Sequence, residues 1–350
     1  MMHSFENLEK YIDSLLAEKT VENIIVRVGR GDEILCDVKR TAEDRVLSDK
    51  TLFDMASVTK IVVVTSLALI AIDKGLLSVS DPVSKFFPVP DDKKEMTVKH
   101  LMTHTVSISH NSLRKCEYKG KYEGVEHCIL SVPLSKPLGS SIRYSCFGFI
   151  LLGRILETIY GERLDVAFKK RVAEPLGMTM TSYLPDRTLD IVNARMLDEN
   201  VGIVHDPNCR RLGGVAGNAG LFSNLGDMTL FAKMLIAHGS PLFSKETFLL
   251  AAKNYTANME TTDTYGHRGL GYIHVNEHFG QAAGLFPDGS VGHCGHTGQS
   301  VFVDPESGLY VIVLSDATRS VEKKLGKHSY EPIVQMRREL HSAIKADLGL

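Results

Sequence analysis

Two side chains that could carry out nucleophilic catalysis stand three residues apart in the segment Ser57-Val58-Thr59-Lys60. On a helix, residues i and i+3 share one face, so the Ser57 hydroxyl and the Lys60 amine can meet. A serine is a weak nucleophile until a neighbouring base takes its proton. A lysine can be that base when burial lowers its pKa, and an apolar stretch, Ile61 to Ile72, follows directly. The pattern predicts Ser57 as nucleophile and Lys60 as a proton-handling partner.

The Ser-x-x-Lys spacing alone is not specific, because the chain contains it four times. The other copies are Ser112/Lys115, Ser320/Lys323 and Ser342/Lys345. They stand in polar stretches, where a lysine keeps its ordinary charge. Only Ser57 leads from a loop into an apolar helix, so the context selects this copy.

A tyrosine at the start of a predicted helix is the second candidate group. Tyr144-Ser145-Cys146 follows the polar segment Gly139 to Arg143 and precedes the helical run Phe147 to Tyr160. Tyr144 can therefore project from a loop, and a phenol placed between positive groups can act as a base. We predict that it shares the proton handling with Lys60. A tyrosine that merely packs against the helix is the alternative that this motif alone leaves open.

The third candidate is the segment His293 to Ser300, which is rich in small residues and runs into a strand. Small residues at a strand edge let a substrate backbone approach closely. They also leave a backbone N–H free to face a developing oxyanion. We assign that role to the N–H of Gln299, paired with the N–H of Ser57. His296, Thr297 and Gly298 are the expected substrate contacts of this segment.

The elements that must position these groups fall into two classes along the chain. The predicted strands form two pairs near the ends, Asn23 to Val28 with Glu33 to Val38, and Ser300 to Val303 with Leu309 to Ser315. Helices are expected over Met1 to Glu18, Thr97 to His104, Phe147 to Tyr160, Leu164 to Ala173, Met228 to His238 and Glu331 to Ala346. We expect a sheet subdomain made of residues 1–80 and 228–350, and a mainly helical subdomain made of residues 81–227.

The composition limits the partners. The 350 residues are 43% hydrophobic and 23% charged with a net charge of −2, so no nucleic-acid or anionic-membrane partner is expected. The apolar run Ile61 to Ile72 is shorter than the roughly 20 residues of a membrane-spanning helix. No signal peptide is visible, and the six cysteines form no CxxC pair. These observations favour a cytoplasmic protein that acts on a small molecule and leave its oligomeric state open.

In their order, the three candidate motifs resemble those of the class C β-lactamase-related group, which includes esterases, D-amino-acid peptidases and penicillin-binding proteins. That group combines Ser-x-x-Lys, Tyr-x-Asn, and Lys-Thr-Gly or His-Thr-Gly. The resemblance extends to three longer segments, residues 97–105, 212–223 and 304–315, and covers roughly residues 20–345. It implies an α+β fold of the β-lactamase/DD-peptidase type: a mainly antiparallel sheet flanked by helices, plus an all-helical subdomain. It also implies an acyl-enzyme on Ser57 that water hydrolyses, with no metal or organic cofactor.

Two departures from the family pattern bear on the substrate. Cys146 stands where the family has an Asn that can contact the substrate amide, and a thiol is a poor substitute. His296 stands where β-lactamases and transpeptidases have a lysine, although esterase-like members often have histidine. Both changes favour a small ester or amide as substrate. A D-amino-acid peptidase or weak penicillin-binding enzyme, and a non-catalytic sensor that keeps the fold, are the alternatives.

A metal site is a further alternative, suggested by two groups of residues. His100 and His104 lie four apart on a predicted helix, and His293, Cys294 and His296 cluster near the C-terminus. The first pair has no acidic partner between its members, and the second group coincides with the strand motif described above. The glycine-rich segment 266–271 follows no predicted strand, so we interpret it as a turn rather than a nucleotide loop. We therefore expect no metal site and no nucleotide.

Overall fold

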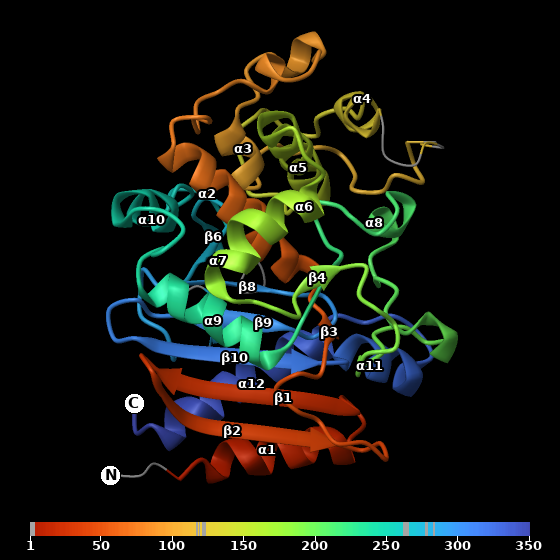
Figure 1. The fold of residues 1–350 in the computed structure, drawn as a ribbon, viewed down its shortest axis with the longest axis vertical. Coiled ribbons are helices and arrows are strands. Elements are labelled where there is room, and N and C mark those ends of the chain that lie inside the picture. The colour runs from red at the N-terminus through yellow and green to blue at the C-terminus, as the bar shows by residue number, and fades with distance from the viewer. Residues whose placement is uncertain are drawn as a thin grey trace.

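A seven-stranded antiparallel sheet built from both ends of the chain organises the fold (Figure 1). The computed structural model describes residues 4–116, 118, 120, 124–261, 266–276, 279–282 and 284–350. The strands are β1 Asn23–Arg30, β2 Glu33–Thr41, β6 His267–Arg268, β7 Ile273–His274, β8 Val291–Cys294, β9 Ser300–Val303 and β10 Leu309–Ser315. Their order is β2-β1-β10-β9-β8-β7-β6, so the predicted sheet from both termini is confirmed.

The two neighbouring interior strands β1 and β10 are apolar on both faces because helices cover both sides of the sheet. In β1, Ile24 and Val26 contribute to one hydrophobic cluster, while Ile25 between them contributes to the other. In β10, which pairs with β1, Ile312 and Val313 alternate in the same way. This two-residue period produces two separate cores, one on each side of the sheet.

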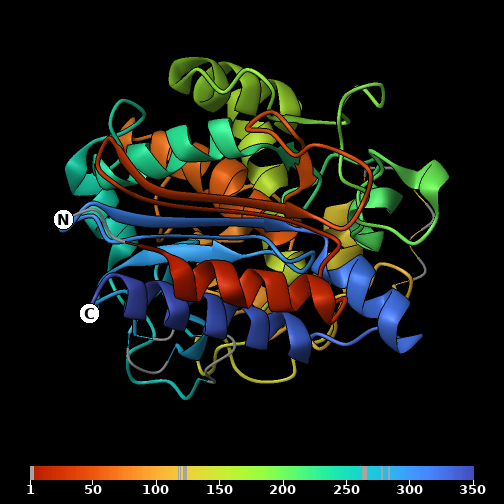
Figure 2. The same cartoon turned by 90° about the horizontal axis from the view of Figure 1, so that it is seen from below.

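Two helices from opposite ends of the chain cover one face of the sheet. They are α1 Glu6–Ala17 and α12 Glu331–Asp347, which lie side by side in Figure 2. The Asp347 carboxylate accepts the N–H groups of Asn7 and Leu8 and so satisfies the start of α1. The opposite face packs against α9 Leu225–Ile236 and, beyond it, the helical region in the upper half of Figure 1.

The segment between residues 81 and 227 holds helices α3 to α8 joined by long loops, and it also contributes two strands to a second, three-stranded sheet. That sheet has the order β3-β5-β4, with β3 Phe53–Asp54, β4 Ser182–Tyr183 and β5 Leu221–Ser223. The remaining α-helices are α2 Ser66–Asp73, α3 Val98–Met102, α4 Val125–Leu130, α5 Cys146–Tyr160, α6 Leu164–Phe168, α7 Glu174–Leu176, α8 Pro207–Arg211, α10 Lys245–Ala252 and α11 Ala317–Leu325. Short helical turns are η1 Ala56–Val58, η2 Lys60–Thr65, η3 Val83–Lys85, η4 Asp91–Lys93, η5 Lys169–Ala173, η6 Asp198–Asn200 and η7 Gly280–Ala282.

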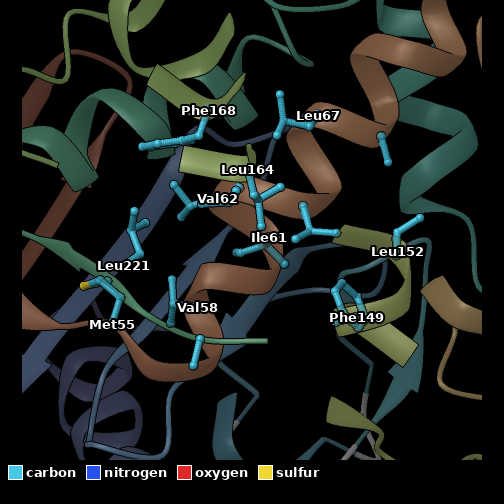
Figure 3. Packing of buried hydrophobic residues seen from close by; sticks show 14 of the residues in the cluster. Met55, Val58, Ile61, Val62, Leu67, Phe149, Leu152, Leu164, Phe168 and Leu221 are labelled. Atoms are coloured by element: carbon cyan, nitrogen blue, oxygen red, sulfur yellow. The ribbon is translucent and has the colours of Figure 1, made fainter. Parts of the chain in front are cut away.

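The helix that follows Ser57 runs through the larger core. Its residues Val58, Ile61 and Val62 pack against side chains of α5, α6 and β5, as Figure 3 shows. Ala56–Asp73 is the one helix of the described chain that is long and apolar enough to cross a membrane, yet 83% of this segment is buried inside the fold. This burial is what a core helix requires, and it anchors the beginning of the helix firmly in place.

Candidate active site

Ser57 lies in a single helical turn, η1, that leads from strand β3 into the core helix. Ala56, directly before it, has a positive φ of 44°. The Asp54 carboxylate accepts the Ala56 N–H at 2.9 Å, and Met55 donates its N–H to Leu221 of β5 at 2.9 Å. The turn is thus tied to the small sheet on one side and to the core on the other, and it leaves Ser57 half-buried at the surface of a cavity.

The structure brings the three predicted catalytic groups together. Lys60 Nζ lies 3.0 Å from Ser57 Oγ, and the Tyr144 hydroxyl lies 2.6 Å from the same oxygen. Lys60 is fully buried and also donates to the carbonyl of Asn218 at 2.8 Å. In another copy of the Ser-x-x-Lys pattern, Lys323 is 37% exposed and pairs with Glu22, so its surroundings differ from those of the buried Lys60.

The protonation of Lys60 differs from the sequence-based expectation. Burial lowers its pKa, but attraction to the ionised forms of Cys146 and Tyr144 outweighs burial and raises the pKa above its ordinary value. The pKa of Tyr144 is raised because burial outweighs the opposing attraction to Lys60. The expected lowering of the lysine pKa is therefore wrong: Lys60 and Tyr144 form one coupled pair, in which the charge of each group depends on the other.

Tyr144 is held by two residues that the sequence did not reveal. Asn111 Nδ2 donates to the Tyr144 carbonyl at 3.0 Å, and Asn111 Oδ1 accepts the Ser145 hydroxyl at 3.0 Å. The His104 ring packs on the Tyr144 ring with centroids 4.6 Å apart, and its Nδ1 accepts the Ser145 N–H at 3.0 Å. Burial holds the pKa of His104 well below its usual range, so this ring is a neutral support.

Cys146 faces Lys60, as the resemblance implied for this position, with its Sγ atom 4.0 Å from Nζ. Burial raises the pKa of the Cys146 thiol, although attraction to Lys60 opposes this effect. Asn218, from the segment 212–223, hydrogen-bonds the Cys146 thiol and donates to Asp206 at 2.9 Å. An amide group therefore lies beside position 146, but it comes from a different part of the chain.

Only part of the segment His293 to Ser300 lies at the cavity. Of its expected contacts, His296 lines the cavity beside Ser57, whereas Thr297, Gly298 and Gln299 do not. Thr297 is fully buried and donates to the Asp54 carbonyl at 2.8 Å, and Gln299 accepts the Gly295 N–H at 2.7 Å in the turn that joins β8 to β9. From the preceding His-x-Gly triplet, His293 and Cys294 at the end of β8 also line the cavity.

The cavity beside Ser57 has a volume of about 250 Å³. Its lining residues are Ser57, Tyr144, Arg268, Ile273, His293, Cys294, His296 and Tyr330. None of these described residues is acidic, while Arg268 and the nearby Lys60 are cationic. Burial, together with the charges of Arg268 and Lys60, holds the pKa of His293 well below its usual range, so His293 stays neutral. Arg268 also lies over the Tyr144 ring, 5.6 Å from its centroid.

Stacked rings form another wall of the cavity. His296 is stacked on Tyr330, with centroids 5.1 Å apart and planes 8° apart, and on His328 at 4.7 Å. Burial, with the neighbouring His205 and His328, lowers the pKa of His296 to about 3. This wall is therefore neutral and flat, and it suits an apolar or planar part of a substrate.

The structure does not bring the histidines considered for a metal site together as one ligand group. His100 Nδ1 accepts the Thr97 N–H at the start of α3, while His104 supports Ser145. Within the described residues, three candidate ligand atoms converge only at Glu22, Glu43 and Asp316. There the two glutamates form ion pairs with Arg319, and Asp316 accepts backbone N–H groups, so these oxygens already have partners.

The chain is similar in sequence and in fold to several known proteins. A family model described as Beta-lactamase matches residues 8–330. An Escherichia coli K12 protein named "Putative D-alanyl-D-alanine carboxypeptidase" is 27% identical over 310 residues, which cover 77% of this chain and 70% of that protein. A Bacillus subtilis protein named "N-acetylmuramyl-L-alanine amidase" is 28% identical over 310 residues, with coverages of 77% and 69%. The structure of EstCE1, described as a hydrolase with promiscuous acyltransferase activity, superposes with a TM-score of 0.75 at 20% identity and covers 96% of this chain and 98% of its own.

Proposed function

Since this chain belongs to the Beta-lactamase family, we propose that it hydrolyses a small ester or amide through an acyl-enzyme on Ser57. The observation that carries this proposal is the convergence of Lys60 Nζ and the Tyr144 hydroxyl on Ser57 Oγ, at 3.0 and 2.6 Å. A nucleophile within hydrogen-bond reach of its base is the arrangement that acyl transfer requires.

In our proposal the Lys60–Tyr144 pair takes the proton of Ser57. A form with an ammonium and a phenolate has the same total charge as a form with an amine and a phenol. In the ion-pair form, the phenolate oxygen lies next to Ser57 Oγ and accepts its proton as the oxygen attacks. Lys60 remains beside both oxygens and stabilises the negative charge throughout.

The oxyanion would be held by the N–H groups of Ser57 and His296, the latter in place of Gln299. Ser57 lies in the first turn of its helix, where an N–H has no carbonyl partner within the helix. His296 lines the cavity, and no hydrogen bond within the described part of the chain uses its N–H. Gly295 brings this segment close to the nucleophile, because a Cβ atom there would lie 2.7 Å from the Met55 carbonyl.

The Tyr144→Phe variant tests this division of labour. Its ring keeps the contact with His104, but the oxygen 2.6 Å from Ser57 Oγ is lost. We expect kcat for short-chain p-nitrophenyl esters to fall by about 10²-fold, the scale of a lost acid–base group. A kcat within threefold of wild type would remove Tyr144 from the mechanism. A wild-type protein that is acylated yet never turns over would instead support the non-catalytic sensor.

Arg268 favours a second candidate, the hydrolysis of a peptide or amide that carries a free carboxylate. The Arg268 guanidinium lines the cavity beside Ser57, and a guanidinium can donate two parallel hydrogen bonds to the carboxylate of a substrate. The names of the two curated relatives, a carboxypeptidase and an amidase, support this candidate. A carboxylate-binding Arg268 would favour a peptide substrate, whereas Cys146 and His296 favour an ester.

Arg268→Gln separates the two candidates. We expect kcat/KM for an ester that bears a carboxylate to fall by about 10-fold or more, the value of a hydrogen bond to a charged group. The matched ester with a neutral carboxamide should change by less than about threefold. Equal losses for both esters would show that Arg268 does not recognise a carboxylate.

The expectations of a cytoplasmic location and of a small-molecule partner, without nucleic acid or membrane, remain proposals that rest on the sequence. The net charge of −2 and the small cavity support a small-molecule substrate.

A further inference from the structure

Asp54 connects three segments around the nucleophile without lining the cavity. Its carboxylate accepts the Ala56 N–H at 2.9 Å through Oδ1 and the His205 N–H at 2.6 Å through Oδ2. Its backbone carbonyl accepts the Thr297 hydroxyl at 2.8 Å. The residue is 1% exposed and is absent from the cavity lining, so it does not touch a substrate there.

The Ala56 N–H needs this acceptor because the backbone at Ala56 is unfavourable. A φ of 44° places an alanine in the left-handed region, which a residue with a Cβ atom adopts only when its surroundings enforce it. Ser57 is the next residue, so any relaxation at Ala56 moves the nucleophile directly. Acceptance of the Ala56 N–H by the Asp54 carboxylate opposes that relaxation.

The second contact reaches the wall of the cavity. His205, whose N–H the carboxylate accepts, has its ring 5.7 Å from the ring of His296, which lines the cavity. A single carboxylate therefore fixes the turn before Ser57 and the segment that supports the His296 wall.

We infer that Asp54 is a positioning residue for the hydrolase reaction. Its two carboxylate oxygens accept the N–H groups of Ala56 and His205 and so keep Ser57 aligned. This inference rests on the proposed function. Misplacing a reacting group by about 1 Å can cost 10²-fold in rate, so a brace of this kind affects kcat without contacting the substrate.

The protonation of Asp54 should make the activity depend on pH. Burial raises the pKa of Asp54 to about 6, although the hydrogen bonds from the His205 and Ala56 N–H groups oppose it. Asp206 raises this pKa further and Arg210 lowers it, and the Cys209 thiol also lies within electrostatic reach of Asp54. Above pH 6 the charged carboxylate accepts both N–H groups. Below pH 6 a proton on one oxygen removes the charge, and both hydrogen bonds become weaker. Activity should therefore fall as the pH drops through about 6.

The test compares Asp54→Asn with a matched control, Asp227→Asn. Asp227 is also a buried carboxylate that accepts two backbone N–H groups, from Met180 at 2.9 Å and Thr181 at 2.8 Å, but it lies outside the cavity lining. An asparagine at position 54 can accept the backbone N–H of either Ala56 or His205 but not both, because its side-chain NH2 group faces the other. We expect kcat of Asp54→Asn to fall by about 10-fold or more with KM within threefold, and the activity loss below pH 6 to disappear. Asp227→Asn should keep the wild-type kcat and pH profile.

Ala56→Gly provides a second test that does not depend on the folding of Asp54→Asn. Glycine adopts a positive φ without strain, so the turn no longer needs the brace. We expect a shallower activity loss below pH 6 in Ala56→Gly than in wild type, and a smaller effect of Asp54→Asn in the Ala56→Gly background.

Three results would overturn the inference: an Asp54→Asn kcat within twofold of wild type, an unchanged acid limb in that variant, or an unchanged acid limb in Ala56→Gly. A fluorophosphonate probe separates this outcome from a failure of the proposed function. If the probe labels Ser57 at equal rates in wild type and Asp54→Asn, only the positioning role fails. If wild type is not labelled at all, the proposed function fails.

Discussion

Replacement of Ser57 by alanine is expected to abolish ester hydrolysis, lowering kcat by about 10³-fold or more. Ser57 Oγ is the atom on which Lys60 and Tyr144 converge, so its loss leaves the proton-handling pair without a nucleophile to activate. The measurement is the rate of p-nitrophenol release from a short-chain ester under saturating substrate. Background from the oxyanion-binding N–H groups should be the only activity that remains.

This variant should fold normally. Ser57 is half-buried at the cavity, and Lys60 keeps its hydrogen bond to the Asn218 carbonyl when the hydroxyl is removed. We expect a change of no more than a few degrees in the unfolding midpoint, as for a small change outside the packed core. A folded Ser57→Ala protein with activity within tenfold of wild type would identify a different nucleophile.

The second large effect is expected for Lys60→Met, which should lower kcat by about 10²-fold or more. Methionine fills much of the space of the lysine stem but cannot carry charge, so Tyr144 loses the cation that makes its ionised form accessible. The protein should remain folded, because a buried charge is replaced by an apolar side chain of similar volume. The rate should be measured with the same ester as for Ser57→Ala.

Lys93→Met is the matched control for this prediction. Lys93 is 1% exposed, and its Nζ lies 2.9 Å from a carboxylate oxygen of Asp92, outside the residues that line the cavity. Its replacement removes an equally buried lysine and should leave kcat unchanged. If Lys60→Met and Lys93→Met have the same kcat, Lys60 has no role in the reaction.

The sequence predicted the elements whose signals are local. Strands β9 and β10 have the bounds that the β-branched runs and the intervening turn indicated, and the helix after Tyr144 begins one residue earlier than predicted. Ser57 and Lys60 could be paired from the sequence because residues three positions apart on one helix share a face. The sequence could not decide between two adjacent triplets, His293-Cys294-Gly295 and His296-Thr297-Gly298, because they have the same form. In the structure, His293 and Cys294 at the end of β8 line the cavity together with His296.

Groups positioned by distant segments could not be predicted. Asn111 reaches Tyr144 across 33 residues, and Asp54 reaches His205 across 151 residues. The position of Arg268 at the cavity could not be predicted, because the glycine-rich segment 266–271 indicates only a turn. The pKa of Lys60 was predicted in the wrong direction for the same reason, because Cys146, 86 residues away, and Tyr144 supply the opposing attraction. Burial can be inferred from an apolar run, but the neighbours of a buried charge cannot.

The most direct test of the central claim is the mass of the protein quenched in acid during turnover of a slowly hydrolysed p-nitrophenyl ester. The acyl-enzyme mechanism predicts one acyl group per chain, located on the peptide that contains Ser57, and no such adduct on Ser57→Ala. An unmodified wild-type chain during steady turnover, or an acyl group on Cys146 or another residue, would contradict the account.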